Sequence, residues 1–235
     1  MKKKVLVCGA TGFIGRNVAE RLSIREDLEV TGVYHNSEPY EFPNLRLIKA
    51  DLTDRAEAEK VVNGNDIIIQ AAATTSGAKD IVTRPYIHVS DNAVMNAHLL
   101  KAAFQDKCSQ FVFFSCSVMY KPSSTPVKES DFNPAEPLVP QYFGVGHTKI
   151  YNEKMCEFYS KIGPTKHTVI RHSNIYGPYD KFDLDRSHVF GATVTKVMTS
   201  QDGKVKVWGT GEEERDLLYV SDLTDFVEMA IDGQK

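Results

Sequence analysis

The chain has 235 residues, of which 42% are hydrophobic and 25% charged, and its formal net charge is −3. This length and composition fit one large globular domain, alone or with a small second lobe, and exclude a disordered or fibrous chain. The slightly acidic balance gives no attraction for nucleic acid or for an anionic membrane, so we expect neither as a partner. No run of about 18 apolar residues is present, and the first apolar run is too short for a signal peptide. We therefore expect a cytoplasmic protein.

The four cysteines lie far apart in the sequence and form no C-x-x-C pair. Three of them stand in apolar runs, as small core residues do. This pattern predicts free thiols in a reducing compartment and argues against a disulfide framework or a structural metal site. The cysteines are Cys8, Cys108, Cys116 and Cys156.

Strands and helices alternate along the first part of the chain. Apolar runs predict strands, and apolar residues recurring every third or fourth position predict helices. Such alternation is typical of an α/β fold with a doubly wound parallel sheet. The strands are expected at 5–8, 28–34, 45–50, 66–70, 111–114 and 168–171, and the helices after the third glycine of the first turn and at 56–62, 92–104 and 149–162.

The domain organisation follows from where this alternation stops. Residues 1–175 are expected to form a dinucleotide-binding domain. Residues 176–235, rich in Gly and Asp, are expected to be loops of a partial substrate-binding lobe interleaved with it. Residues 123–140, rich in Pro, Ser and acidic side chains, are predicted to be a surface loop.

A glycine-rich turn follows the first predicted strand, with the spacing G-x-x-G-x-x-G. The strand before it and the amphipathic helix after it are the context that a dinucleotide site needs. The first glycine permits the tight turn, the second lets backbone N–H groups approach a pyrophosphate, and the third lets the helix pack on the strand. The helix N-terminus offers further free N–H donors. A glycine-rich turn without a ligand is the alternative. The predicted dinucleotide contacts are Gly9, Thr11, Gly12, Phe13, Ile14 and Gly15.

The position that usually distinguishes NAD from NADP has no carboxylate. An Asp or Glu about 20 residues after the turn normally binds the ribose 2′-hydroxyl of NAD. Here the sequence is Tyr34, His35 and Asn36, with His35 the expected contact. An acid would repel a 2′-phosphate, so its absence favours NADP, with NAD possible.

Two further segments follow predicted strands at their carboxyl ends, where ligands of parallel sheets lie. Asp51 and Leu52 follow the third strand, where the Asp51 carboxylate could meet the adenine amino group. A turn or capping aspartate is the alternative for this residue. Ala71, Ala72 and Ala73 follow the fourth strand, where small side chains would let the backbone approach the cofactor.

With these motifs the sequence resembles the extended short-chain dehydrogenase/reductase family, in its nucleotide-sugar branch and within it the GDP-L-fucose synthase group. The resemblance implies a Rossmann fold and covers residues 4 to about 229. Enzymes of this kind usually continue further, so the substrate lobe is expected to be incomplete. The motifs are GATGFIG at 9–15, SCSVMY at 115–120, Lys149 with EKMCE at 153–157, NIYGP at 174–178, YDKF at 179–182, SHV at 187–189, WGTG at 208–211 and RDLLYVSDL at 215–223.

The resemblance also implies roles for individual residues. Lys149 would hold the nicotinamide ribose and lower the pKa of a neighbouring acid. Asn174, Trp208 and Arg215 would line the sugar-nucleotide site, where the donor fork of an arginine suits a diphosphate. His188 would match the acid of an epimerisation step. The family precedent further implies a homodimer packed through helices 92–104 and 149–162.

Three catalytic groups of the family are replaced in this sequence. The tyrosine of Tyr-x-x-x-Lys is Val145, the Ser or Thr four residues before Tyr120 is Cys116, and the epimerase cysteine is Val118. Either other groups took over the chemistry, or the chemistry is slow, altered or lost.

Several side chains are candidates for the missing acid. Tyr142 lies seven residues before Lys149 and would share its helix face if the helix began earlier. Gly144 and Gly146 argue against a regular helix there. The other candidates are Cys116, Ser117, His147 and His188.

These observations predict an oxidoreductase or epimerase that transfers hydride between NADP(H) and a 4-keto-6-deoxy sugar nucleotide. One alternative is a sugar-nucleotide 4-epimerase or 4,6-dehydratase that holds NAD. The other is a dinucleotide-binding protein with impaired catalysis.

Overall fold

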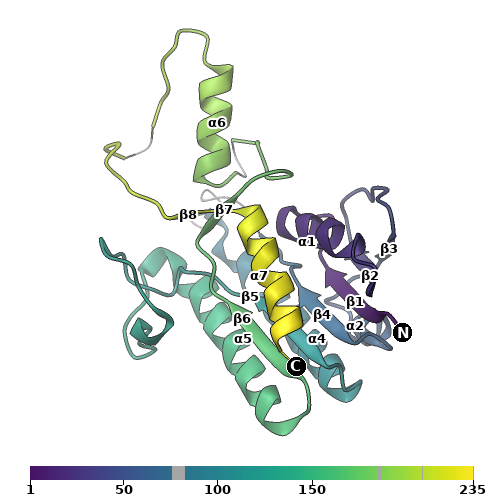
Figure 1. Cartoon of the computed structure of the whole chain (residues 1–235). Helices are drawn as coiled ribbons and strands as arrows, with labels where there is room; N and C mark the ends of the chain where they lie inside the picture. Colours follow the sequence, from purple (N-terminus) through teal and green to yellow (C-terminus); the bar gives the residue numbers. More distant parts are fainter. Residues whose placement is uncertain (76–82, 185–186, 208, 235) are drawn as a thin grey trace.

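The central sheet has six parallel strands in the order β3-β2-β1-β4-β5-β6. In the computed structural model, which describes residues 1–75, 83–184, 187–207 and 209–234, the chain builds β1 to β3 in one direction and then crosses to β4, β5 and β6 (Figure 1). Ligands of doubly wound sheets bind where the order reverses, at the carboxyl ends of the strands. The predicted Rossmann fold is therefore confirmed. The strands are β1 Lys3–Cys8, β2 Leu28–Tyr34, β3 Leu45–Lys49, β4 Ile67–Gln70, β5 Gln110–Phe114 and β6 Lys166–Ile170.

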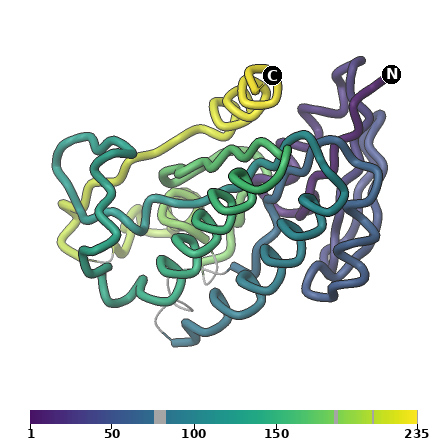
Figure 2. Tube along the Cα trace, turned by 90° about the horizontal axis from the view of Figure 1, so that it is seen from below, coloured from purple at the N-terminus to yellow at the C-terminus, as the bar shows by residue number. Residues whose placement is uncertain are grey.

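Helices cover both faces of this sheet. α1 and α7 pack on each other over one face, and α4 packs between α2 and α5 over the other. Figure 2 shows α7 on one side of the sheet, with α4 and α5 on the opposite side. Each strand and helix predicted before residue 175 is present. The helices are α1 Phe13–Ser23, α2 Arg55–Val62, α4 Ser90–Gln105, α5 Phe143–Ile162 and α7 Val220–Gly233.

The core is divided by the sheet into two layers. Successive side chains of β1 point to opposite faces, so Val5 and Val7 pack beneath α1 and α7 while Leu6 and Cys8 pack beneath α2 and α4. All four are fully buried. Burial on both faces makes a parallel strand read as a continuous apolar run, which is why β1 was predictable.

α7 was not predicted, because residues after 175 were expected to form loops. Its buried residues Leu223, Val227 and Ile231 recur every fourth position and join the core layer of β1 and α1. Near the end of α7, Asp232 pairs with Arg25, which lies two residues after α1, at 3.0 Å. The expectation of loops is therefore wrong for α7, which is part of the main core. The division of the chain at residue 175 stays a prediction.

A second, two-stranded sheet joins distant parts of the chain. β7 (Asn174–Tyr176) and β8 (Leu217–Tyr219) pair in parallel, with Asn174 opposite Leu217. In the sequence, α6 (Val189–Thr199) lies between these two strands. It is another helix that was expected to be loop, and it projects away from the main sheet (Figure 1). The NIYGP and RDLLYVSDL motifs thus lie side by side.

The start of α5 also differs from the prediction. The helix begins at Phe143, so the interpretation that Gly144 and Gly146 exclude a regular helix was wrong. A Cβ on Gly146 would lie 2.6 Å from Leu138 Cδ1, and one on Gly144 would lie 2.9 Å from Val89 Cγ2. The glycines let α5 approach its neighbours closely, and this packing offsets their helix propensity penalty of about 1 kcal/mol each.

Short 3₁₀ helices flank these elements at η1 Pro85–His88, η2 Glu129–Asp131 and η3 Pro140–Tyr142. η2 lies within the segment 123–140 that was predicted as a surface loop, and η3 begins at its last residue; most of this segment is exposed. Among the described helices, none has both the length and the apolarity needed to cross a membrane.

Candidate active site

The glycine turn has the geometry that its sequence predicted. Gly9 adopts φ = +75°, in the left-handed region, and its carbonyl accepts a hydrogen bond of 2.9 Å from the Gly12 N–H. A Cβ on Gly9 would lie 2.7 Å from Ala72 Cα, and one on Gly15 would lie 2.1 Å from the Gly9 oxygen. The turn therefore has no room for larger residues at either position.

The N-terminus of α1 faces outward from this turn. Gly12 is the N-cap, it is exposed, and no side chain caps the helix. The first turn, with the half-buried Phe13 and Ile14, contains no acidic residue. Uncapped N–H groups and the positive end of the helix dipole together make an anion site, which suits a diphosphate.

The segment after β4 closes one side of the turn. The Ala71 N–H donates to the Cys8 oxygen at 3.2 Å. The next residue, Ala72, lies directly against Gly9. The Gln70 amide brackets Ala72, donating to its oxygen at 3.1 Å and accepting from its N–H at 3.2 Å. Asn92 brackets Thr74 in the same way, with both bonds at 2.9 Å. Sequence reasoning missed Gln70 and Asn92, although Gln70 is a polar residue ending an apolar run.

His35 and Asp51 lie near each other at the ends of β2 and β3. His35 Nε2 is 3.8 Å from Asp51 Oδ2, and both side chains are half-exposed. The Asp51 carboxylate accepts hydrogen bonds from the Thr53 hydroxyl at 2.7 Å and from its N–H at 2.9 Å, which lower the Asp51 pKa. Asp51 thus caps a turn while one side remains open to a ligand. The Leu52 side chain is buried in the core.

Arg16, which sequence reasoning missed, links the glycine turn to the loop after β7. Its guanidinium lies between the rings of Tyr40 and Tyr179, 3.9 and 3.8 Å from their centroids. It also pairs with Glu20 at 2.8 Å. The Tyr40 hydroxyl donates to the Ala10 oxygen at 3.2 Å. Two loops on either side of α1 are therefore held together beside the turn.

Lys149 reaches from α5 to the carboxyl end of β5. Its Nζ donates to the Phe114 oxygen at 2.6 Å and lies 4.9 Å from the centroid of the Phe113 ring. Burial lowers the pKa of this ammonium group. Val145 occupies the position one helical turn earlier, where the family has tyrosine.

Two residues after β5 differ in their surroundings. Cys116 is half-buried and interacts electrostatically with Lys149. Burial raises the pKa of its thiol, while the charge of Lys149 opposes this rise. Ser117 is exposed. The structure thus brings Cys116 and Lys149 together.

The other candidates on α5 lie at its beginning. Tyr142 is half-buried and is the N-cap residue of α5, two turns before Lys149. His147 is exposed, and its ring packs against that of Phe143 with centroids 4.6 Å apart. Tyr142 therefore lies at the start of α5, two turns from Lys149, whereas the His147 side chain faces outward.

A buried polar network, also missed from the sequence, lies behind Lys149. Arg171, directly after β6, contacts both carboxylate oxygens of Glu153 on α5, at distances down to 2.7 Å. The Ser115 hydroxyl donates to Glu153, and Arg171 donates to the Tyr120 hydroxyl at 2.8 Å. The Glu153 carboxylate raises the pKa of Arg171 further. This network fixes the ends of β5 and β6 against α5.

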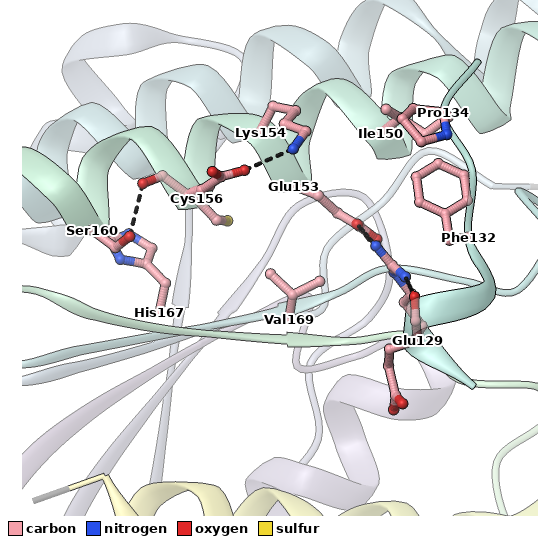
Figure 3. Close-up of a pocket in the computed structure, with 12 residues that line it drawn as sticks. Glu129, Phe132, Pro134, Ile150, Glu153, Lys154, Cys156, Ser160, His167 and Val169 are labelled. Carbon is pink, nitrogen blue, oxygen red and sulfur yellow. Dashed lines mark hydrogen bonds and ion pairs between the residues drawn. The ribbon is translucent and has the colours of Figure 1, made fainter.

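The network borders a groove of about 520 Å³ between α5, β6 and the loop around η2. Figure 3 shows Glu153 pointing from α5 into this groove, between Phe132 of the loop and Val169 of β6. His167 lies at its far end, near Ser160.

The residues expected to bind the sugar nucleotide lie on β7 or after it. The Asn174 side chain donates to the Asp216 oxygen at 3.2 Å, across the small sheet. Arg215 is exposed and donates to the oxygen of Glu214 at 2.7 Å. Trp208 lies outside the described residues.

His188 is the N-cap residue of α6. It interacts electrostatically with Asp180, whose pKa is raised by burial and held back by hydrogen bonding and by His188. His188 therefore lies beside an acidic group in the small lobe.

The strand order, the uncapped helix at a glycine turn and the inward lysine define a dinucleotide-binding Rossmann protein. A family model described as the NAD dependent epimerase/dehydratase family matches residues 5–235. The chain belongs to this family, the extended short-chain dehydrogenases/reductases, as its motifs predicted.

Its curated relatives are sugar-nucleotide enzymes. The chain is 29% identical to a GDP-L-fucose synthase from Sinorhizobium fredii, over 95% of this chain and 68% of that protein. It is 27% identical to a GDP-L-colitose synthase from Yersinia pseudotuberculosis (95% and 70%). It is also 27% identical to GDP-mannose 3,5-epimerase 1 from Oryza sativa subsp. japonica (96% and 60%).

Solved structures agree with the fold. A UDP-glucose 4-epimerase from Thermotoga maritima has a TM-score of 0.82 at 23% identity, over 97% of this chain and 72% of that one. A UDP-glucuronic acid 4-epimerase from Bacillus cereus, in complex with UDP-glucuronic acid and NAD, has a TM-score of 0.80 at 24% identity (97% and 73%). At these identities the likeness shows the fold alone.

Proposed function

We propose that the chain is an oxidoreductase or epimerase that transfers hydride between NADP(H), or NAD(H), and a 4-keto-6-deoxy nucleotide sugar. Its relatives include reductases, epimerases and dehydratases of sugar nucleotides. The proposal depends on one observation: the glycine turn with the uncapped N-terminus of α1 and the Lys149 side chain lie at the same edge of the sheet. A structural domain would not need both.

The cofactor is proposed to bind along this edge. Its diphosphate would lie on the N–H groups of residues 11–15, and its adenosine between His35 and Asp51. The backbone of residues 71–73 would run beneath it. Because the end of β2 carries no carboxylate, NADP(H) is the preferred form and NAD(H) the second. When bound, the nicotinamide supplies hydride acceptance and donation.

The protein groups would position the sugar and handle its proton. Lys149 would hold the nicotinamide ribose, and its charge would favour an alkoxide nearby. Tyr142, Cys116, Ser117 and His188 are the proposed candidates for proton transfer. Cys116 is the weakest donor of these, because a thiol forms weak hydrogen bonds.

The nucleotide sugar would bind across the small sheet. Asn174, Arg215 and Trp208 are its proposed contacts, with Arg215 suited to the diphosphate. A GDP sugar is the proposed substrate, because three of the relatives act on GDP sugars by name.

Incubation of the chain with a GDP-4-keto-6-deoxy sugar and NADPH or NADH tests the proposal. Stoichiometric consumption of the reduced cofactor identifies a reductase. Product without net oxidation identifies an epimerase or dehydratase. Dinucleotide binding without any turnover would support the alternative of a catalytically impaired binding protein.

A homodimer is also proposed. Three large apolar side chains of α5, Tyr151, Phe158 and Ile162, are each at least half exposed and recur at helical spacing along one face. An apolar helix face of this kind suits packing against the same face of a second copy. Sedimentation of the wild type and of Phe158→Glu distinguishes a dimer from a monomer.

A further inference from the structure

The site has a lysine but no tyrosine beside it, so the proton of the reacting hydroxyl has no assigned partner. Val145 fills the tyrosine position and has no group that can exchange a proton. A substitute must lie near Lys149 and carry an accessible acceptor or donor. His172, in the short link between β6 and β7, was not among the candidates from sequence.

His172 and Lys149 both lie next to Phe114, the last residue of β5. Lys149 Nζ lies 2.6 Å from the Phe114 oxygen, and the His172 ring lies 6.4 Å from the Phe114 ring, centroid to centroid. The two side chains come from different elements, α5 and the β6–β7 link. Both therefore lie at the carboxyl end of β5, where the reacting end of a bound dinucleotide is proposed to lie.

The backbone fixes the tautomer of His172. Its Nδ1 is 2.8 Å from the Ser173 oxygen, and a carbonyl oxygen can only accept a hydrogen bond. Nδ1 therefore carries the proton in the neutral ring, which leaves a lone pair on Nε2. Among the described residues, none forms a hydrogen bond with Nε2. His172 is half-buried, so the ring is enclosed without being sealed from a ligand.

The surroundings keep this imidazole neutral. Burial lowers the His172 pKa to about 4, although the bond to Ser173 opposes the shift. The charged groups that face it from packed elements are Lys149 of α5 and His188 at the start of α6, and both lower the pKa further. A neutral ring with a free lone pair is a proton acceptor at neutral pH.

We propose that His172 is the general base of this site, with Nε2 accepting the hydroxyl proton of a nucleotide-sugar alcohol. The inference rests on the proposed function. As the proton moves to Nε2, the O–H electrons form the C=O bond and the C–H hydrogen leaves as hydride to the nicotinamide of NAD⁺ or NADP⁺. In the reverse direction Nε2 must first take up a proton from solvent, which it then gives to the carbonyl oxygen, so atoms and charge balance both ways.

The first test compares His172→Asn with the wild type and with His167→Asn as a matched control. His167 lies on β6 at the opposite end of the sheet. The substrates are GDP-mannose with NAD⁺ or NADP⁺, and a GDP-4-keto-6-deoxy sugar with NADH or NADPH. We expect His172→Asn to lose about 10²–10⁴-fold in kcat with dinucleotide affinity unchanged, and to lose the acidic limb of the pH profile of oxidation. Imidazole should partly restore turnover of His172→Ala, and His167→Asn should match the wild type.

Turnover by His172→Asn within about threefold of the wild type, with the same pH profile, would overturn the inference and leave the proposed function intact. Failure of the wild type to bind any dinucleotide would refute the proposed function itself, and the inference with it.

A second measurement does not need turnover. In ¹⁵N-histidine NMR spectra, His172 should show a protonated Nδ1 and an unprotonated Nε2 that titrates well below the ordinary histidine pKa of about 6.5. The opposite tautomer, or titration with an ordinary histidine pKa, would overturn the assignment.

Discussion

Removing one member of the buried pair between Arg171 and Glu153 should strongly destabilise the carboxyl end of the sheet, because the other member would stay buried without its partner. Their side chains are only 19% and 10% exposed. Arg171→Met would leave the Glu153 carboxylate buried with the Ser115 hydroxyl as its remaining partner. Removing one member of such a pair costs about 3–5 kcal/mol, because the other charge stays desolvated. For a chain of this size this corresponds to a Tm lower by about 6–20 °C.

The pair can be tested by a double-mutant cycle in thermal or urea denaturation. Glu153→Leu with Arg171→Met removes both charges and should recover most of the loss, since no buried charge is left. The exposed pair of Arg55 and Glu59, at 2.7 Å, gives the control: Arg55→Met should change Tm within the error of the measurement. If Arg171→Met is no more destabilising than Arg55→Met, or the double variant is as unstable as the single one, the reasoning is refuted.

Three further predictions concern the cofactor turn, the thiol and pH. Gly15→Ala should abolish dinucleotide binding in calorimetric titration, because the added Cβ would lie 2.1 Å from the Gly9 oxygen. Gly233→Ala is the control and should bind normally, because the space around its Cβ is open. Equal affinities of the two variants would contradict this prediction. Cys116 should react with iodoacetamide more slowly than a free thiol at pH 8, because burial raises its pKa, and rapid labelling would refute it. The His172 pKa, about 4 in the fold against 6.5 for the free group, means that the unfolded chain takes up the proton first. Stability should therefore fall as pH drops from about 6.5 to 4, by about 3 kcal/mol at most from this residue. Urea denaturation of His172→Asn should show a shallower fall, and an identical pH dependence would count against the buried neutral ring.

The parts of the fold that could be predicted are those with a local signal. Val5 to Cys8 form an unbroken apolar run because both faces of β1 are covered. Gly12 and Gly15 would place a Cβ against Gly9 of the same turn, and Gly9 adopts a positive φ there, so the sequence shows these needs directly. Both signals depend on neighbours along the chain, so no tertiary information was needed.

The missed helices depend on non-local packing. α7 has its apolar stripe at Leu223, Val227 and Ile231, but the stripe makes sense only against α1 and β1, which lie some 200 residues earlier. The start of α5 was misread for the same reason: Gly146 lowers helix propensity locally, and its benefit comes from Leu138.

The site divides in the same way. Lys149 and the glycine turn follow from motifs, whereas Arg171, Glu153 and His172 acquire their roles from residues on other elements. A histidine in a short link between strands gives no periodic signal. The neighbouring Ser173 oxygen fixes its tautomer, but only the approach of β5, α5 and the β6–β7 link to one another places it near Lys149.

The proposed function depends on the turn between β1 and α1, whose backbone amides are proposed to bind the diphosphate of a nicotinamide dinucleotide. Titration of the protein with NADPH and NADH, followed by calorimetry or by the fluorescence of the reduced nicotinamide, tests this most directly. We expect saturable binding of one dinucleotide per chain, lost in Gly15→Ala and kept in Gly233→Ala. Binding of neither cofactor at millimolar concentration, or unaltered binding by Gly15→Ala, would contradict it.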